Sequence, residues 1–258
     1  MDFDLDPGWS LSPVGGTTGG AFLGVHAHEK FFLKRNASPF LAALSVEEIT
    51  PRLIWTKRMT TGDVLTAQEW LNGQTLTRAQ MNTPMVAKLL ARVHHSQLLH
   101  RMLKKVGAPM PTPAQLRERY VADLPKALRQ HPLVAQTAKR LKNLPPQVAS
   151  TVCHGDLNHK NWLLSDTHKL YLVDWDQASL GDPAFDLSVV LINYVPRKQW
   201  GTWMDAYGTH LSPELLAPIM WYGQLHLLEA VRFGYEQQRY TEMNQALIRL
   251  QALIDQTD

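Results

Sequence analysis

The sequence predicts an α+β fold with two lobes, because its pattern changes from strand-like to helical part-way along the chain. Short apolar runs separated by turn residues fill the first part, as in an antiparallel sheet. Further along, apolar residues recur at helical spacing, with Val86, Leu90 and Val93 on one face. We therefore expect a small antiparallel β-rich lobe over residues 1–72 and a larger, mostly helical lobe over residues 73–258.

The strands expected in the first lobe are short runs of apolar, aromatic and β-branched residues. Glycine, asparagine and aspartate stand in the breaks between them, as is typical of turns. A Gly62-Asp63 pair, for example, predicts a turn in front of the last run. The expected strands cover residues 21–25, 30–34, 53–55 and 64–70.

The second lobe is expected to be helical except for one strand-rich island. Helices are predicted over residues 113–128 and 132–144, each of which begins at a proline. Between residues 148 and 175 the helical spacing is lost, and three short apolar runs read as strands. Polar side chains follow the ends of these strands, so the island holds the residues suited to chemistry.

Composition places the chain among ordinary globular proteins of a reducing compartment. With 258 residues and 45% hydrophobic content, it can bury a sizeable core. Cys153 is the single cysteine, so no internal disulfide is possible, and the acidic start Met1–Asp6 does not resemble a secretory signal. We therefore expect a cytoplasmic protein.

Neither membrane insertion nor nucleic-acid binding is predicted. The longest apolar stretch, about residues 187–195, is far shorter than the roughly 20 residues that a membrane-spanning helix needs. The formal net charge of +3 is too small to indicate a nucleic-acid partner.

The densest polar cluster is His154-Gly155-Asp156 followed by Asn161, with Asp174 further along. Phosphoryl transfer from ATP needs a carboxylate that orients the attacking hydroxyl, and oxygen ligands that hold Mg²⁺ against the phosphates. Asp156 and Asn161 have the spacing of a protein-kinase catalytic loop, and Asp174 ends a later strand, where a kinase has its metal-binding aspartate. The cluster therefore contains both the carboxylate and the Mg²⁺ ligands that phosphoryl transfer needs.

These motifs strongly resemble the aminoglycoside phosphotransferase and choline kinase family, which are small-molecule kinases with a bilobal, protein-kinase-like fold. The resemblance runs from Gly15 to about Tyr235. It implies that Asp156 is the catalytic base and that Asn161 and Asp174 are Mg²⁺ ligands.

The same resemblance implies two supporting residues. The segment Gly181–Leu187 is similar to the family's G-D-P-x-x-D-L motif, whose last aspartate, here Asp186, supports the catalytic loop. His154 is expected to brace that loop rather than to react.

The first lobe should supply the nucleotide site. A glycine-rich loop can approach phosphates closely with its backbone N–H groups, and its candidate residues are Gly15, Gly16, Thr17, Thr18 and Gly19. Lys34 resembles the strand lysine that binds the α- and β-phosphates. Because side chains alternate along a strand, the neighbouring Arg35 should point the other way.

Two further features bear on nucleotide binding. The residues Glu69 and Leu71 lie in a segment that resembles the connector between lobes, whose backbone would bind the adenine edge. In the family, the strand lysine meets a glutamate on the next helix. Here the first acids after Lys34 are Glu47 and Glu48, which come too late for that role.

The predicted function is therefore the ATP- and Mg²⁺-dependent transfer of a γ-phosphoryl group to a hydroxyl of a small molecule. Choline, thiamine and an aminoglycoside are candidate acceptors, and the oligomeric state is left open. A non-catalytic nucleotide-binding module is the first alternative. The second is a metal-dependent hydrolase, whose candidate ligands are His154, Asp156, His159, Asp174 and Asp176.

An aromatic group near the C-terminus could hold a cationic acceptor through cation–π and charge contacts. Its helical spacing, however, is more typical of a buried core. The group comprises Trp200, Trp203, Trp221, Tyr222 and Tyr235, with Glu229 nearby.

Overall fold

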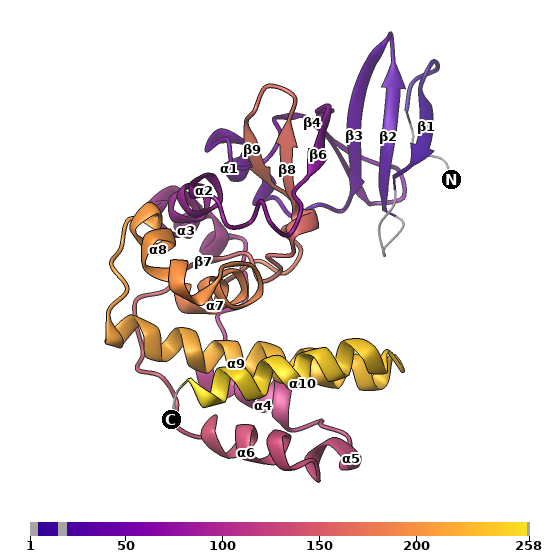
Figure 1. Cartoon of the computed structure of the whole chain (residues 1–258). Coiled ribbons are helices and arrows are strands. Elements are labelled where there is room, and N and C mark those ends of the chain that lie inside the picture. The colour runs from indigo at the N-terminus through magenta and orange to yellow at the C-terminus, as the bar shows by residue number, and fades with distance from the viewer. Residues whose placement is uncertain (1–4, 15–19, 257–258) are drawn as a thin grey trace.

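The structure is a computed structural model that describes residues 5–14 and 20–256. It has an antiparallel sheet near the N-terminus and helices over most of the rest, which confirms the α+β class (Figure 1). The predicted loop residues Gly15 to Gly19 lie outside the described residues.

The N-terminal sheet has five antiparallel strands in the order β1-β2-β3-β5-β4. They are β1 (Ser10–Pro13), β2 (Ala21–His26), β3 (Glu29–Arg35), β4 (Leu53–Arg58) and β5 (Val64–Glu69). Phe22, Leu33 and Leu65 form a small buried cluster on one side of this sheet. The alternation of side chains along β3 thus buries Leu33 and directs Lys34 to the opposite side.

A short helix connects this sheet to the helical part. In α1 (Leu41–Val46), Leu44 is fully buried and belongs to the large core formed mainly by the helices. The N–H of Leu172 donates a 2.8 Å hydrogen bond to the carbonyl of Ile49, just beyond this helix. The segment after β3 is thereby attached to the strands that carry the candidate site.

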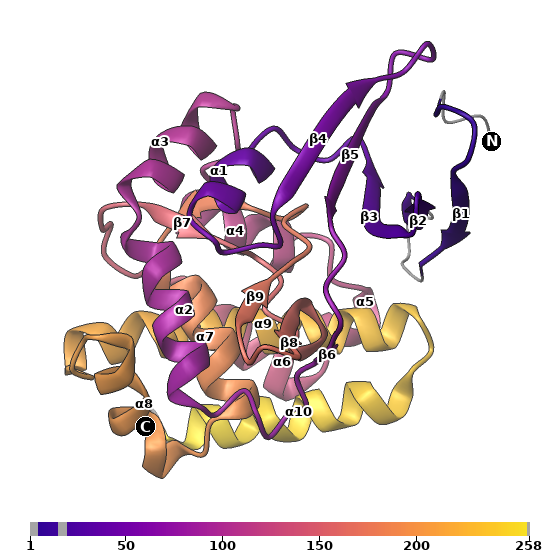
Figure 2. The same cartoon turned by 90° about the horizontal axis from the view of Figure 1, so that it is seen from above.

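The remaining helices form the body of the molecule, and α9 and α10 lie side by side in both views (Figures 1 and 2). The helices are α2 (Pro84–His95), α3 (Gln97–Lys105), α4 (Pro113–Val121), α5 (Lys126–Arg129), α6 (Pro132–Arg140), α7 (Pro183–Tyr194), α8 (Trp200–Tyr207), α9 (Pro213–Glu236) and α10 (Tyr240–Asp255), with 3-10 turns η1 (His159–Asn161) and η2 (Arg197–Gln199).

Two small sheets pack against the helices. One pairs β7 (Thr151–Cys153) with β10 (Ser179–Gly181). The other has the order β6-β8-β9 and is made of β6 (Gly73–Thr75), β8 (Trp162–Ser165) and β9 (Leu170–Leu172). The strand-rich island expected near residues 148–175 is present, and the loops between its strands carry the polar cluster.

Two expected helices are shorter than predicted. The helix expected over residues 113–128 is split, because Pro125 cannot continue a helix and disfavours helical backbone at Leu124. The helix expected to reach Leu144 ends at Arg140, and Pro145 likewise disfavours helical backbone at Leu144. Among the described residues, no helix is both long and apolar enough to cross a membrane.

Candidate active site

The loop between β7 and β8 places Asp156 and Asn161 in direct contact. The side-chain nitrogen of Asn161 donates to the carbonyl of Asp156 at 2.8 Å and to its carboxylate Oδ2 at 3.0 Å. Asp156 is exposed, and the amide orientation leaves the side-chain oxygen of Asn161 available to a cation. The loop thus presents a carboxylate and an amide oxygen next to each other.

His154 is buried behind this loop and joins it to the residue before Asp174. Its Nε2 lies 3.0 Å from the carbonyl of Val173, and its Nδ1 accepts a 3.1 Å hydrogen bond from the N–H of Asp156. Nε2 must therefore carry the proton. Burial lowers the pKa of His154, so the ring is neutral at pH 7. These contacts agree with the bracing position expected for His154.

Asp186 holds the start of the same loop from the first turn of α7. Its carboxylate accepts hydrogen bonds from the N–H groups of His154 at 2.7 Å and Gly155 at 3.1 Å. Its Oδ2 is also 3.2 Å from Nε2 of His94, whose Nδ1 is 2.8 Å from the Tyr207 hydroxyl. Burial alone would raise the pKa of Asp186, but the hydrogen bond and charge interaction with His94 and the hydrogen bond from the backbone N–H of His154 hold it below its usual range.

His94 has no role at the site in the prediction from sequence, although it follows Val93 and has the helical spacing of the buried face that Leu90 marks. Its contact with Asp186 joins residues 92 positions apart, so helical spacing alone could not show it. A histidine on an otherwise apolar helix face was the available signal, because a buried polar group needs partners.

Gly155 is required by close packing within the loop. Its φ is +83°, which is a left-handed conformation that side chains disfavour. A Cβ at this position would lie 2.6 Å from the carbonyl oxygen of Gln177. The loop therefore packs directly on the segment that follows Asp174.

Asp174 follows β9 and has a left-handed φ of +63°. Aspartate tolerates this conformation better than most residues, and strained backbone of this kind is common at functional sites. The N–H of Val173 donates a 2.9 Å hydrogen bond to the carbonyl of Asn161. The two predicted metal ligands, Asn161 and Asp174, are thereby on adjoining backbone segments.

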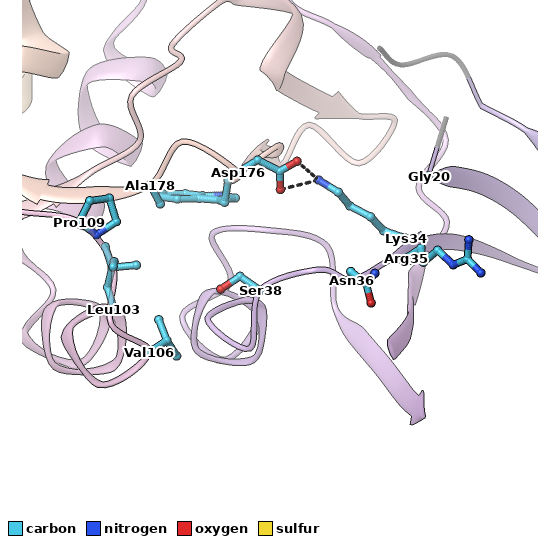
Figure 3. A pocket seen from close by; sticks show the side chains of 12 residues that line it. Gly20, Lys34, Arg35, Asn36, Ser38, Leu103, Val106, Pro109, Asp176 and Ala178 are labelled. Carbon is cyan, nitrogen blue, oxygen red and sulfur yellow. Dashed lines mark hydrogen bonds and ion pairs between the residues drawn. The ribbon is translucent and has the colours of Figure 1, made fainter. Parts of the chain in front are cut away.

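Lys34 reaches this carboxylate cluster from β3 (Figure 3). Its Nζ is 3.2 Å from Oδ1 of Asp174, and 2.8 and 2.9 Å from the two carboxylate oxygens of Asp176. Burial alone would lower the pKa of Lys34, but Asp176 and Asp174 raise it above the usual value. Arg35 points away and pairs with Asp63 at 2.9 Å, as alternation predicted.

Asp176 is the lysine partner that the sequence did not identify, since it was considered only as a ligand in the hydrolase alternative. The two acids that follow β3 are engaged elsewhere. Glu47 accepts a hydrogen bond from the Ser96 hydroxyl at 3.0 Å, and Glu48 pairs with Lys169 at 2.8 Å. The expectation that neither reaches Lys34 agrees with these contacts.

A cavity of about 520 Å³ lies beside Lys34 and Asp176. Gly20, at the end of the predicted glycine-rich loop, also lines it, together with Trp175 and the loop after α3 (Figure 3). The connector residues Glu69 and Leu71 do not line this cavity. The N–H of Glu69 is used inside the sheet, where it donates to the carbonyl of Arg52 at 2.8 Å.

The arrangement of these residues does not favour the metal-dependent hydrolase, whose candidate ligands would have to form a dinuclear metal centre. Both ring nitrogens of His154 are already used by backbone groups, so this residue has no lone pair free for a metal. Within the part of the chain that the structure describes, no group of three or more His, Cys, Asp or Glu side chains is arranged to hold a metal ion. Oxygen ligands from Asn161 and Asp174 are a different donor set, suited to Mg²⁺ with phosphates.

Most of the aromatic group near the C-terminus belongs to the core, as its spacing suggested. Trp200, Trp203, Trp221 and Tyr222 are buried, and Tyr235 is partly buried against the same core. Tyr222 differs from the three tryptophans because it also lines a second, smaller cavity.

Solved structures share this fold. A choline/ethanolamine kinase family protein from Mesorhizobium loti has a TM-score of 0.68 at 17% identity, covering 95% of this chain and 88% of that one. Choline kinase LicA from Streptococcus pneumoniae has a TM-score of 0.66 at 18% identity, covering 95% of both chains. A GDP complex of aminoglycoside 2'-phosphotransferase-IIIa has a TM-score of 0.68 at 15% identity, covering 99% and 96%. At these identities the likeness shows the fold alone.

Sequence comparison finds relatives that match about half of the chain, and a family model that matches most of it. Protein LicA of Haemophilus influenzae is 29% identical over 124 residues, which is 46% of each chain. A LicA homolog of Metamycoplasma hominis is 25% identical over 156 residues, which is 57% of this chain and 58% of that protein. The chain thus spans about half the length of the curated relatives it matches. The model of the phosphotransferase enzyme family matches residues 25–222, and the chain belongs to that family.

Proposed function

We propose that this protein transfers the γ-phosphoryl group of ATP to a hydroxyl of a small molecule. The observation that carries the proposal is the convergence of Lys34 on Asp174, with Asp156 and Asn161 on the adjoining loop. Lys34 and Asp174 are 140 positions apart in the sequence. Phosphoryl transfer needs a base, oxygen ligands and a cation for the phosphates, and these residues supply all three.

Asp156 is the group proposed to orient the acceptor hydroxyl and to take its proton. Its carboxylate is exposed, so an acceptor can reach it, while Asn161 binds Oδ2 and limits its rotation. The neutral ring of His154 holds the backbone N–H of Asp156. A base that is fixed on one side and open on the other is suited to direct in-line transfer.

Asn161 and Asp174 are proposed to hold Mg²⁺. Their amide and carboxylate oxygens fit Mg²⁺, which proteins bind through one or two carboxylates together with substrate phosphates. When bound, the ion would neutralise charge on the transferred group. Lys34 is proposed to bind the α- and β-phosphates, with its charge maintained by Asp174 and Asp176. The residues from Gly15 to Gly19, Glu69 and Leu71 are the proposed remainder of the nucleotide site.

The family supports this reading. Choline kinase and aminoglycoside 2'-phosphotransferase are among the proteins that share the fold, and related structures contain AMP or GDP. We therefore propose a nucleoside triphosphate as the phosphoryl donor, and ATP in particular. Choline, thiamine and aminoglycosides are the proposed acceptor candidates.

The test is mass-spectrometric detection of a phosphorylated product. The protein would be incubated with MgATP, or separately MgGTP, and a pooled panel of choline, ethanolamine, thiamine, homoserine, sugars and aminoglycosides. Asp156→Asn should keep MgATP binding but reduce turnover by at least about 100-fold, since a general base contributes typically 10²–10⁴-fold. Asp174→Ala should lose the Mg²⁺-dependent thermal stabilisation by ATP as well as turnover.

These measurements separate the proposed kinase from a non-catalytic nucleotide-binding module. Full activity in Asp156→Asn would show that Asp156 is not the base. Nucleotide binding to the wild type without any product would favour a non-catalytic nucleotide-binding module. If neither nucleotide binds, the proposal fails altogether.

A further inference from the structure

Lys34 uses its full hydrogen-bonding capacity on the carboxylates of the candidate site. A lysine ammonium group has three N–H donors and no acceptor. The Nζ of Lys34 makes three carboxylate contacts, one at 3.2 Å with Asp174 and two at 2.8 and 2.9 Å with the oxygens of Asp176. In this arrangement each donor of Lys34 has a carboxylate acceptor, so the lysine must give up a contact before it can bind a phosphate.

Asp176 makes the larger share of this contact. Both of its carboxylate oxygens face Nζ of Lys34, whereas Asp174 contributes one oxygen (Figure 3). The first helix after β3, α1, has the sequence LAALSV and carries no acidic residue. The partner of Lys34 therefore comes from the loop after β9, and it holds the lysine beside the proposed metal ligands.

The pair lies where a phosphate group could reach it. Lys34, Asp176 and Gly20 line the same cavity of about 520 Å³. The side chain of Lys34 is 21% exposed, and the side chains of Asp174 and Asp176 are 53% and 52% exposed. Ion pairs that water reaches to this degree are weak, so the pair can open easily when another partner arrives.

The charges around Nζ indicate when Lys34 can leave. Without the lysine, two carboxylates that face the same point would repel each other and the phosphates of a nucleotide. With Mg²⁺ on Asp174, as proposed above, the negative charge stays neutralised and Lys34 can turn its donors to the phosphates. The release of Lys34 is thereby tied to the arrival of a second cation.

We propose that Asp176 is a positioning residue, which holds Lys34 on the carboxylates until a nucleotide binds together with its metal ion. Lys34 then exchanges Asp176 for the phosphates. Free divalent cations bind poorly before that exchange, because the ammonium group occupies their place. The inference rests on the phosphoryl transfer proposed above, and it adds the state of the site that precedes nucleotide binding.

The first test measures metal binding without a nucleotide. Mn²⁺ is the probe, because it takes the same oxygen ligands as Mg²⁺ and its free ion is counted by electron paramagnetic resonance. Lys34→Met should bind Mn²⁺ at least about fivefold more tightly than the wild type, since the competing cation is gone. Arg35→Gln is the matched control and should bind Mn²⁺ as the wild type does, because Arg35 lines the same cavity but pairs with Asp63.

The second test measures ATP binding in EDTA, where Lys34 has to leave Asp176 without help from a metal ion. Asp176→Asn should bind metal-free ATP more tightly than the wild type. Loss of a negative charge near the phosphates also favours ATP, so the same substitution is made in Lys34→Met. By titration calorimetry, the gain should be about two- to fivefold larger when Lys34 is present, which is the size expected of a partly exposed ion pair.

Several results would overturn the inference. Equal Mn²⁺ affinity in the wild type and Lys34→Met is one, and a rise in Arg35→Gln as large as that in Lys34→Met is another. An equal gain from Asp176→Asn with and without Lys34 would show a general charge effect only. Weaker ATP binding in Asp176→Asn would mean that Asp176 holds Lys34 in the orientation that binds phosphates. Asp176→Glu keeps the charge and should restore the wild-type affinity for metal-free ATP.

Neither measurement depends on turnover, so the inference and the proposed function can fail separately. A protein that phosphorylates an acceptor but shows equal Mn²⁺ affinities keeps the proposed function and loses this inference. A protein that phosphorylates no acceptor but shows both expected gains keeps the exchange of Lys34 and loses the kinase activity. Failure to bind ATP with or without Mg²⁺ would overturn both.

Discussion

Lys34 and Asp176 form a two-point ion pair, with Nζ 2.8 Å from Oδ1 and 2.9 Å from Oδ2. The pair joins β3 of the N-terminal sheet to the loop after β9, across 142 positions of sequence. It also holds the ammonium group 3.2 Å from Asp174. The same contact therefore links the two parts of the fold and positions a cation beside the proposed metal ligands.

Lys34→Met should weaken MgATP binding at least about tenfold, because the phosphates lose a charge-assisted partner. The free energy of unfolding should change by no more than about 1 kcal/mol, since the pair is partly exposed to water. Titration calorimetry with MgATP and urea denaturation would measure the two effects. Lys30→Met, on the same strand but exposed, is the control. Equal MgATP affinity in both variants would contradict the role proposed for Lys34.

The parts of the site that sequence predicts are those encoded locally. The spacing of Asp156 and Asn161 lies within one loop, and the alternation along β3 was enough to separate Lys34 from Arg35. These relationships need no knowledge of the tertiary fold. The α+β class followed for the same reason, because strand and helix periodicities are local signals.

The parts that sequence missed depend on contacts between distant segments. Asp176 meets Lys34, and His94 meets Asp186, only after the sheet, α2 and α7 have packed together. The split of the predicted helix at Pro125 is different, because a proline in that position was a visible signal that was not used. Its effect on backbone could have been predicted.

Asp186→Asn should be strongly destabilising. It removes a buried charge that accepts from two backbone N–H groups and from His94, and breaking a buried pair of this kind costs roughly 3–5 kcal/mol. Asp205→Asn is a matched control, since Asp205 pairs with His210 at the surface and should lose at most about 1 kcal/mol. Urea denaturation of both variants would test this, and similar losses in the two would contradict the buttressing role.

Gly155→Ala should reduce both stability and turnover. A left-handed φ costs an alanine roughly 1–2 kcal/mol, and its Cβ would also be forced against the Gln177 carbonyl. Gly107→Ala isolates the first cost, because Gly107 has a φ of +76° but no atom within 4 Å of an added Cβ. Thermal denaturation should therefore show a larger loss of stability in Gly155→Ala than in Gly107→Ala, and kcat should fall more in Gly155→Ala. Equal losses in stability would show that the loop can move away from Gln177.

Acid should destabilise the protein between about pH 6.5 and 4, partly through His226. Burial lowers the pKa of His226 to about 4, whereas an unfolded histidine has a pKa of about 6.5. Within this window the unfolded chain binds a proton that the folded protein does not, so the free energy of unfolding falls as pH falls. The slope from one such group is at most about 1.4 kcal/mol per pH unit, and it vanishes below about pH 4, when both states are protonated.

His226→Gln tests this assignment. Nε2 of His226 lies 3.1 Å from the carbonyl of Phe185, and a glutamine can still donate a hydrogen bond there without titrating. His154, whose pKa burial also lowers, keeps its own contribution of the same sign in both proteins. Urea denaturation at pH 7, 6 and 5 should therefore show a shallower, but not flat, loss of stability in the variant. Identical slopes would mean that His226 is protonated in the folded protein as readily as in the unfolded chain, and that its contact with Phe185 does not require the neutral ring.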